Sequence, residues 1–165
     1  MKAMGRRGFT AALAGSLALP ALAWQARTRV KVATLPVPAS LPEAARMAEK
    51  QGGPLVLLVS LPGCPYCELV RRNYLLPARN ESSLEAWQLN INDNSTPLLD
   101  FDGKPTTAAV WTKAWKATFT PTVLFLGPQG QKLAEPLVGV AVPDFYGAYL
   151  DERLALARTA FFALR

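Results

Sequence analysis

The chain of 165 residues is half hydrophobic and 18% charged, a balance that is typical of one folded domain and excludes a disordered chain. Its formal net charge is +6, but three of the basic residues, Lys2, Arg6 and Arg7, lie within the first ten positions. The remaining chain is only mildly basic, so we expect no nucleic-acid partner.

The sequence contains no histidine and only two cysteines. Histidine is the usual general base near neutral pH and a common metal ligand, so both of these roles lose their main candidate. A structural zinc site needs about four ligands, mostly cysteine and histidine. We therefore expect no metal ion, and nothing else in the sequence calls for a cofactor.

Residues 1–23 have the pattern of an export signal. A basic start leads into an apolar stretch that closes on Ala21-Leu22-Ala23, which predicts cleavage after Ala23 and a periplasmic destination. The alternatives are a core helix or a membrane anchor, for which the stretch is short. Arg6-Arg7-Gly8-Phe9 resembles a twin-arginine signal, and an ordinary signal remains open. No later apolar run suits a bilayer span, so we expect no stable membrane insertion.

Residues 24–40 are predicted to be a linker, or to contain an edge strand at Val30-Lys31-Val32, and the domain itself is predicted to span 41–165. Residues 41–51 predict a helix with Ser40 as its N-cap. One face of this helix is apolar. That face consists of Leu41, Ala44, Ala45 and Ala48.

Residues 54–61 form a short continuous apolar run, which predicts a strand that is covered on both faces. Pro62-Gly63 ends this strand. Residues 65–76 predict a second helix, which Pro77 closes. Residues 87–91 predict the next strand, and residues 92–105 are rich in Asp, Asn and Pro and predict a loop.

Thr106 or Thr107 can cap a third helix that runs through Lys116. Its predicted apolar stripe consists of Val110, Trp111, Ala114 and Trp115. Residues 122–126 and 132–138 predict two strands, which the turn 127–130 joins as a hairpin. A last helix is predicted from 143 to 158. Alternating strands and helices predict an α/β fold with a central mixed sheet, helices on both faces and a C-terminal antiparallel hairpin.

Cys64-Pro65-Tyr66-Cys67 lies at the junction of the strand 54–61 and the helix 65–76. A thiolate is the species that attacks a disulfide, and a helix N-terminus stabilises a thiolate. Pro65 suits the first helical position, where its missing N–H costs little. We therefore predict Cys64 as the nucleophile, Cys67 as the resolving thiol and a redox disulfide between them. A purely structural disulfide is disfavoured because so small a loop constrains the unfolded chain little.

At this point the chain resembles the thioredoxin superfamily over residues 40–158. The resemblance rests on the strand ending at Leu61, the Cys64-Pro65-Tyr66-Cys67 motif, Thr120-Pro121-Thr122, the Gly127-Pro128-Gln129-Gly130 turn, Leu137-Val138-Gly139 and the last helix. It implies a thioredoxin-like fold and a cis Thr120–Pro121 bond, with Pro121 against the active-site disulfide. The alternative is that Pro121 only begins a strand. Pro65, Tyr66, Thr120 and Pro121 are therefore the expected supporting residues, with Tyr66 exposed and in contact with substrate.

The chain also departs from thioredoxins proper. They carry a buried acidic residue at the position of Leu58, and Glu68, the nearest acid, is expected to face solvent. Pro65-Tyr66 is similar to glutaredoxins. The segments Pro62-Gly63-Cys64-Pro65-Tyr66-Cys67-Glu68 and Pro143-Asp144-Phe145-Tyr146 are similar to exported thioredoxin-like proteins associated with bacterial sulfur oxidation.

Other residues near these segments are predicted to be structural. Arg71 and Arg72 are expected on a solvated helix face. Trp111, Trp115 and Phe119 are expected to pack in the core rather than form a substrate platform. Phe161 and Phe162 are either packed under the last helix or exposed as a patch for a partner.

The resemblance and the motif together predict a periplasmic thiol-disulfide oxidoreductase that reduces protein disulfides. Its expected partners are protein thiols and disulfides, together with a membrane electron donor that restores the dithiol. A disulfide oxidase or isomerase, a glutathione-dependent reductase and a binding module whose partners ignore the cysteines are the alternatives.

Overall fold

The computed structural model describes residues 33–82 and 84–164. The predicted signal at 1–23 and the predicted edge strand at Val30-Lys31-Val32 lie outside these residues. The described end of the 24–40 segment packs on the domain, since Leu35 is buried and the Pro36 carbonyl accepts a hydrogen bond of 2.9 Å from the Gln88 amide. Within the described part of the chain, no helix has both the length and the apolar character that a membrane span requires.

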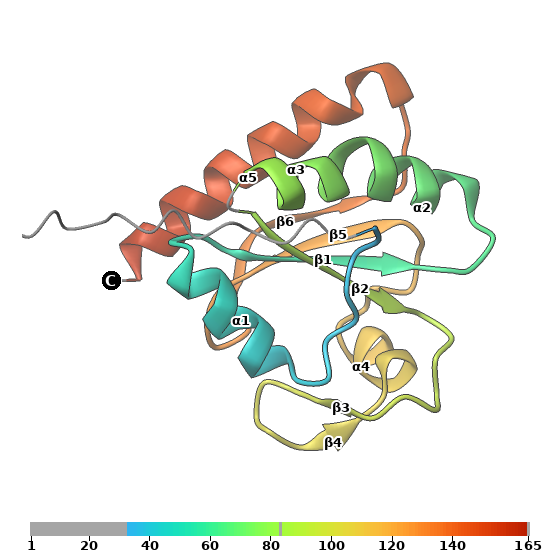
Figure 1. Ribbon diagram of the computed structural model, residues 1–165, viewed down its shortest axis with the longest axis vertical. Helices are drawn as coiled ribbons and strands as arrows, with labels where there is room; N and C mark the ends of the chain where they lie inside the picture. The colour runs from blue at the N-terminus through green and yellow to red at the C-terminus, as the bar shows by residue number, and fades with distance from the viewer. Residues whose placement is uncertain (1–32, 83, 165) are drawn as a thin grey trace, which may run out of the picture.

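A four-stranded mixed sheet forms the centre of the molecule (Figure 1), in the order β2-β1-β5-β6. Its strands are β1 (Leu55–Ser60), β2 (Glu85–Asn90), β5 (Thr122–Leu126) and β6 (Lys132–Val138). β1 runs parallel to β2 and antiparallel to β5, and β6 returns antiparallel to β5 as the predicted hairpin.

Helices cover both faces of this sheet (Figure 1). One face carries α1 (Leu41–Lys50) and α4 (Ala108–Ala114), and the other carries α2 (Pro65–Val70), α3 (Leu76–Glu81) and α5 (Tyr146–Ala163). All six residues of β1 are buried. Val56 and Leu58 point to the α2–α5 side, while Leu57 and Val59 point to the α1–α4 side. Burial on both faces explains the unbroken apolar run in the sequence. The predicted fold class is confirmed.

The beginning of α1 follows the sequence pattern. The Oγ atom of Ser40 accepts a hydrogen bond of 3.3 Å from the Glu43 amide, as an N-cap does. The four apolar residues predicted to share a face are all buried. Local sequence signals therefore suffice for this helix.

The predicted end of the second helix at Leu76 is wrong. A π-helical turn, Arg71–Leu75, follows α2 and leads directly into α3, so the helical stretch continues to Glu81. The Leu76 amide bonds to the Arg71 carbonyl, five residues earlier. This wider turn accommodates the Pro77 ring, which in a regular helix would clash with the preceding turn.

Two predictions between residues 85 and 106 also need correction. β2 begins at Glu85 rather than Trp87, and the Glu85 carboxylate is 5% exposed and lies 2.5 Å from Arg79 Nη1. The predicted loop 92–105 contains β3 (Leu98–Leu99), which pairs with β4 (Pro105–Thr106). Strands of two residues are too short to leave a periodic pattern.

Thr107 caps α4 as predicted, with its side chain accepting from the Val110 amide at 3.4 Å, but the helix ends at Ala114 rather than Lys116. Of the predicted apolar stripe only Trp111 is buried, whereas Val110 and Ala114 are exposed and Trp115 is partly buried. The last helical stretch begins with a 3-10 turn, Pro143–Phe145, and α5 continues to Ala163, beyond the predicted end at 158. Phe161 is buried and its neighbour Phe162 is exposed. The first therefore packs under the last helix, and the second lies at the surface.

Candidate active site

The cysteine motif lies between the end of β1 and the start of α2. Cys64 occupies the N-cap of α2, and Pro65 is the first helical residue. The Cys67 amide donates a hydrogen bond of 3.2 Å to the Cys64 Sγ atom. The free amides at a helix start favour negative charge, so this position favours a thiolate at Cys64 when the pair is reduced.

Cys64 and Cys67 form a disulfide, with their Cα atoms 5.3 Å apart. Cys67 is fully buried, while Cys64 is partly exposed. Of the two sulfur-bearing residues, Cys64 is therefore the more accessible to an external thiol or disulfide. Tyr66, between them, is 54% exposed and adjoins the point of attack.

The Thr120–Pro121 segment lies at the same end of the sheet as the motif. Val59 lies opposite Thr122 in the antiparallel pairing of β1 with β5, which places Pro121 beside the turn that leads to Cys64. The Thr120–Pro121 peptide bond is cis, which is the conformation that the resemblance to the thioredoxin superfamily implies. The Gly139 amide donates a hydrogen bond of 2.7 Å to the Pro121 carbonyl, so the start of β5 is bound to the end of β6.

No acid occupies the buried position in the strand before the motif. Leu58 fills it and is fully buried in the apolar core. Glu68 is about half exposed and pairs with Arg71 and Arg72. The hydrogen bond from Arg71 is the main cause that lowers the pKa of Glu68, which makes this carboxylate a weaker base. Glu68 is therefore poorly suited to deprotonate the resolving thiol.

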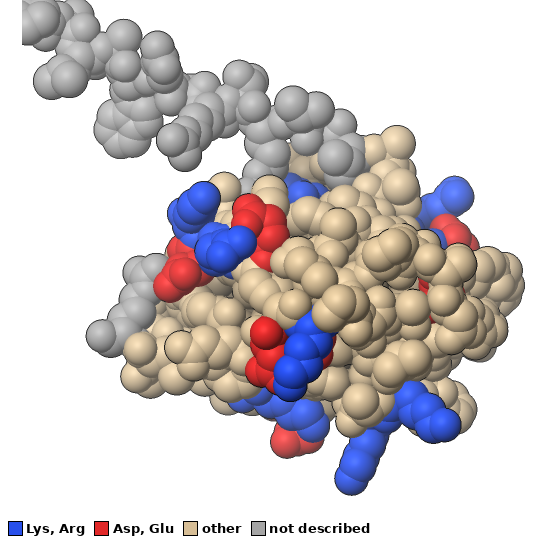
Figure 2. Space-filling model, turned by 90° about the horizontal axis from the view of Figure 1, so that it is seen from below, with Lys and Arg blue, Asp and Glu red and all other residues tan. Residues whose placement is uncertain are grey.

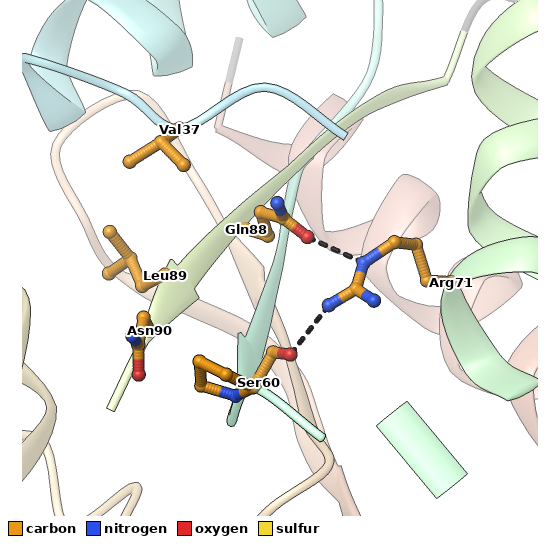
Figure 3. A pocket seen from close by; sticks show the side chains of 7 residues that line it. Val37, Ser60, Arg71, Gln88, Leu89 and Asn90 are labelled. Atoms are coloured by element: carbon orange, nitrogen blue, oxygen red, sulfur yellow. Dashed lines mark hydrogen bonds between the residues drawn. The ribbon is translucent and has the colours of Figure 1, made fainter. Parts of the chain in front are cut away.

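Arg71 does not lie on a solvated helix face as predicted. Its side chain is 11% exposed and reaches from the π-helical turn to the ends of β1 and β2 (Figure 3). Nε donates to Gln88 Oε1 and Nη2 donates to Ser60 Oγ, both at 2.6 Å. No local sequence pattern indicates this role, because Ser60 and Gln88 lie on separate strands that only the parallel pairing of β1 with β2 brings together. Arg72 is 75% exposed, as expected.

A pocket of about 230 Å³ adjoins this arginine, at the carboxyl ends of the parallel strands (Figure 3). Its lining residues are Val37, Ser60, Pro62, Arg71, Gln88, Leu89 and Asn90. Pro62 is part of the turn that leads to Cys64, so the pocket borders the motif. Because Arg71 also bonds to Glu68 on α2, it links the helix that carries the motif to the sheet.

The three aromatic residues near α4 do not share one environment. Trp111 is buried, and its ring stacks on Trp115 with centroids 4.8 Å apart. Phe119 is 68% exposed, so the prediction that it packs in the core is wrong. The short α4 ends before Phe119, which explains why helical spacing misplaces this residue.

Among the described residues, no group of three or more His, Cys, Asp or Glu side chains is arranged to hold a metal ion.

The sequence matches the model of the thioredoxin-like domain family over residues 41–153. This match covers most of the chain and includes both cysteines and Pro121, so the protein belongs to the thioredoxin-like domain family. Its fold and its CxxC pair support thiol-disulfide oxidoreductase chemistry at this general level.

Two solved structures are similar to the chain. A poplar thioredoxin h is 21% identical, with 67% of this chain and 85% of that chain covered and a TM-score of 0.43. A thioredoxin-fold protein from Helicobacter pylori is 19% identical, with 68% of this chain and 84% of that chain covered and a TM-score of 0.41. No curated protein matches the sequence significantly.

Proposed function

We propose that this protein is a periplasmic oxidoreductase that reduces disulfides in other proteins. The observation that carries the proposal is the asymmetric pair at the start of α2. Cys64 is partly exposed and accepts a hydrogen bond from the Cys67 amide, while Cys67 is buried one turn further on. The export pattern of residues 1–23 supports the location, and the resemblance to exported thioredoxin-like proteins supports the direction.

The reaction follows from this asymmetry. The Cys64 thiolate attacks one sulfur of the substrate disulfide, and the other substrate sulfur leaves as a thiolate that takes up a proton. Cys67 loses its proton and attacks Cys64 in the mixed disulfide, which releases the second substrate thiol. Two electrons pass to the substrate, and the Cys64–Cys67 disulfide remains. A membrane dithiol donor then returns two electrons to the pair.

Deprotonation of Cys67 is the step for which the described residues offer no dedicated base. Leu58 is apolar, and the ion pairs of Glu68 make its carboxylate a weak base. Water or the departing substrate thiolate therefore takes this proton. The substrate thiolate is well suited because it is generated beside the pair in the preceding step.

The reduction potential of the pair tests the direction. A value close to about −270 mV supports a reductase, and a value close to about −120 mV would identify a strong oxidant instead. Titration with glutathione and glutathione disulfide supplies the value and tests whether glutathione is a substrate. If partners bind equally well after both cysteines are replaced, the protein is a binding module and the redox proposal fails.

A further inference from the structure

Two exposed hydrophobic side chains lie beside the Thr120–Pro121 segment but outside the cysteine motif. Phe119 is 68% exposed and Val138 is 55% exposed. Val138 pairs with Thr122 at the start of β5, so the two side chains flank the same end of the hairpin. Folding leaves both in contact with water, although burial would be favourable for each.

These side chains border a groove between the end of α4 and β6, which we call the β6 groove. It consists of two depressions of about 110 Å³ and 340 Å³ that share Trp115, Lys116 and Lys132. The smaller depression is otherwise lined by Ala117, Phe119, Thr122, Leu124, Pro136 and Val138. Among the described residues, α4 ends at Ala114 and does not extend along this groove.

The charge of the β6 groove has one sign. Lys116 and Lys132 line both depressions, and none of the described residues that line either one is acidic. Neither lysine forms an ion pair with another described residue. Elsewhere on the α4 side of the sheet, acidic and basic side chains lie next to each other (Figure 2). An apolar floor with two unneutralised cations suits a ligand that is both apolar and acidic.

The groove is poorly suited to a ligand that binds by adding a strand to the edge of β6. β6 is an edge strand, but Pro136 in its middle has no N–H to donate to an added strand. Lys132 at its start adds a charge that discourages pairing with a second edge. A second copy of the chain would also bring like charges together. A ligand in this groove is therefore held by side chains.

We propose that the β6 groove binds an extended acidic segment of the protein substrates. An apolar residue of that segment packs on Phe119, and its carboxylates pair with Lys116 and Lys132. This inference rests on the proposed reductase function, because the groove ends at Phe119, next to Thr120–Pro121. A substrate segment that lies in the groove therefore positions an adjoining substrate cysteine near Cys64.

Two labelled decapeptides without cysteine test the groove separately from redox chemistry. One contains Glu, Asp and a single Phe, and the other has Gln and Asn in place of Glu and Asp. Fluorescence anisotropy with the Cys64→Ser/Cys67→Ser protein should show about 10-fold tighter binding of the acidic peptide at low salt, with the preference declining as salt rises. Lys116→Gln and Lys132→Gln should each weaken it by about 3-fold.

The matched control is Lys50→Gln at the end of α1, which removes the same charge away from the groove and should leave binding unchanged. Equal affinity for both peptides, an equal loss with Lys50→Gln, or a dimer that Phe119→Ser dissociates would overturn the inference. Reduction of dithiodipyridine by the wild-type protein tests the proposed function itself. This small neutral disulfide contains no acidic segment, so its reduction reports on the cysteine pair and not on the groove. No reduction would sink the proposed function even if the acidic peptide binds.

Discussion

The Arg71 guanidinium donates a hydrogen bond of 2.6 Å to the Ser60 hydroxyl, across the junction between the sheet and the helix that carries the cysteines. The same guanidinium bonds to Gln88 on β2 and to Glu68 on α2. One nearly buried cation therefore connects both parallel strands to the motif helix. The position of that helix depends on polar contacts as well as on apolar packing.

Replacement of Arg71 by Met should lower the free energy of unfolding by about 1–3 kcal/mol, because Ser60 and Gln88 lose a buried donor. Chemical denaturation of the oxidised protein measures this change. Arg72→Met is the matched control on the exposed face and should change stability by less than about 0.5 kcal/mol. Equal effects of the two replacements would show that the buried contacts of Arg71 do not add to the free energy of unfolding.

The two cysteines should respond differently to replacement by serine. Cys64→Ser should abolish disulfide reduction, because the buried Cys67 is inaccessible to an external disulfide. Cys67→Ser should still attack but fail to release the product, so a mixed disulfide at Cys64 accumulates. Non-reducing gel electrophoresis and mass spectrometry of the adduct identify the attacking residue. Accumulation of adducts at Cys67 in the Cys64→Ser protein would reverse the assigned roles.

Acidification should destabilise the fold in part through Glu68. Its folded pKa is lowered, mainly by the hydrogen bond from Arg71, from an ordinary value of 4.5. A depressed carboxyl pKa adds stability that is complete above the unfolded value and is lost as pH falls through the folded value. Glu68→Gln should therefore reduce the loss of stability below about pH 4.5. The effect should stay below about 1 kcal/mol because this ion pair is partly solvated.

Measurement of thermal unfolding from pH 7 to pH 3 in the wild type and Glu68→Gln checks this expectation. Asp144→Asn is a useful comparison because it removes another exposed carboxylate that has no ion pair among the described residues. The Asp144→Asn curve should run parallel to the wild-type curve. A parallel curve for Glu68→Gln as well would contradict the role of the Arg71 hydrogen bond.

The hydroxyl of Tyr146 is buried and has no hydrogen-bond partner among the described residues. Burial raises the pKa of this phenol, so it stays neutral. Tyr146→Phe removes the unpaired polar atom and keeps the ring contact with Tyr74, whose centroid lies 5.1 Å away. We expect the free energy of unfolding to rise by about 1 kcal/mol. Tyr74 is only partly buried, so Tyr74→Phe should change the free energy of unfolding by less. A loss of stability in Tyr146→Phe would instead reveal a hydrogen-bond partner for the Tyr146 hydroxyl.

Prediction from the sequence succeeds where neighbouring residues determine the structure. The β5 and β6 boundaries, the Ser40 cap and the position of Cys64 at a helix start all follow from patterns a few residues long. It fails where a distant partner decides. Pro77 does not end its helix because a π-helical turn accommodates the ring, and Glu85 enters a buried strand because Arg79 pairs with it.

For the active site, the sequence by itself determines the chemistry of the pair: two thiols three positions apart at a strand-to-helix junction, with no histidine and with Leu58 at the usual acidic position. Only the tertiary structure decides what surrounds them. Sheet pairing places Pro121 beside the motif. The Arg71 side chain forms a hydrogen bond with Ser60 at the end of β1, and α4 ends before Phe119, which is exposed. These outcomes depend on contacts between segments far apart in the chain, because local patterns specify which face of an element is apolar but not which side chains it will meet.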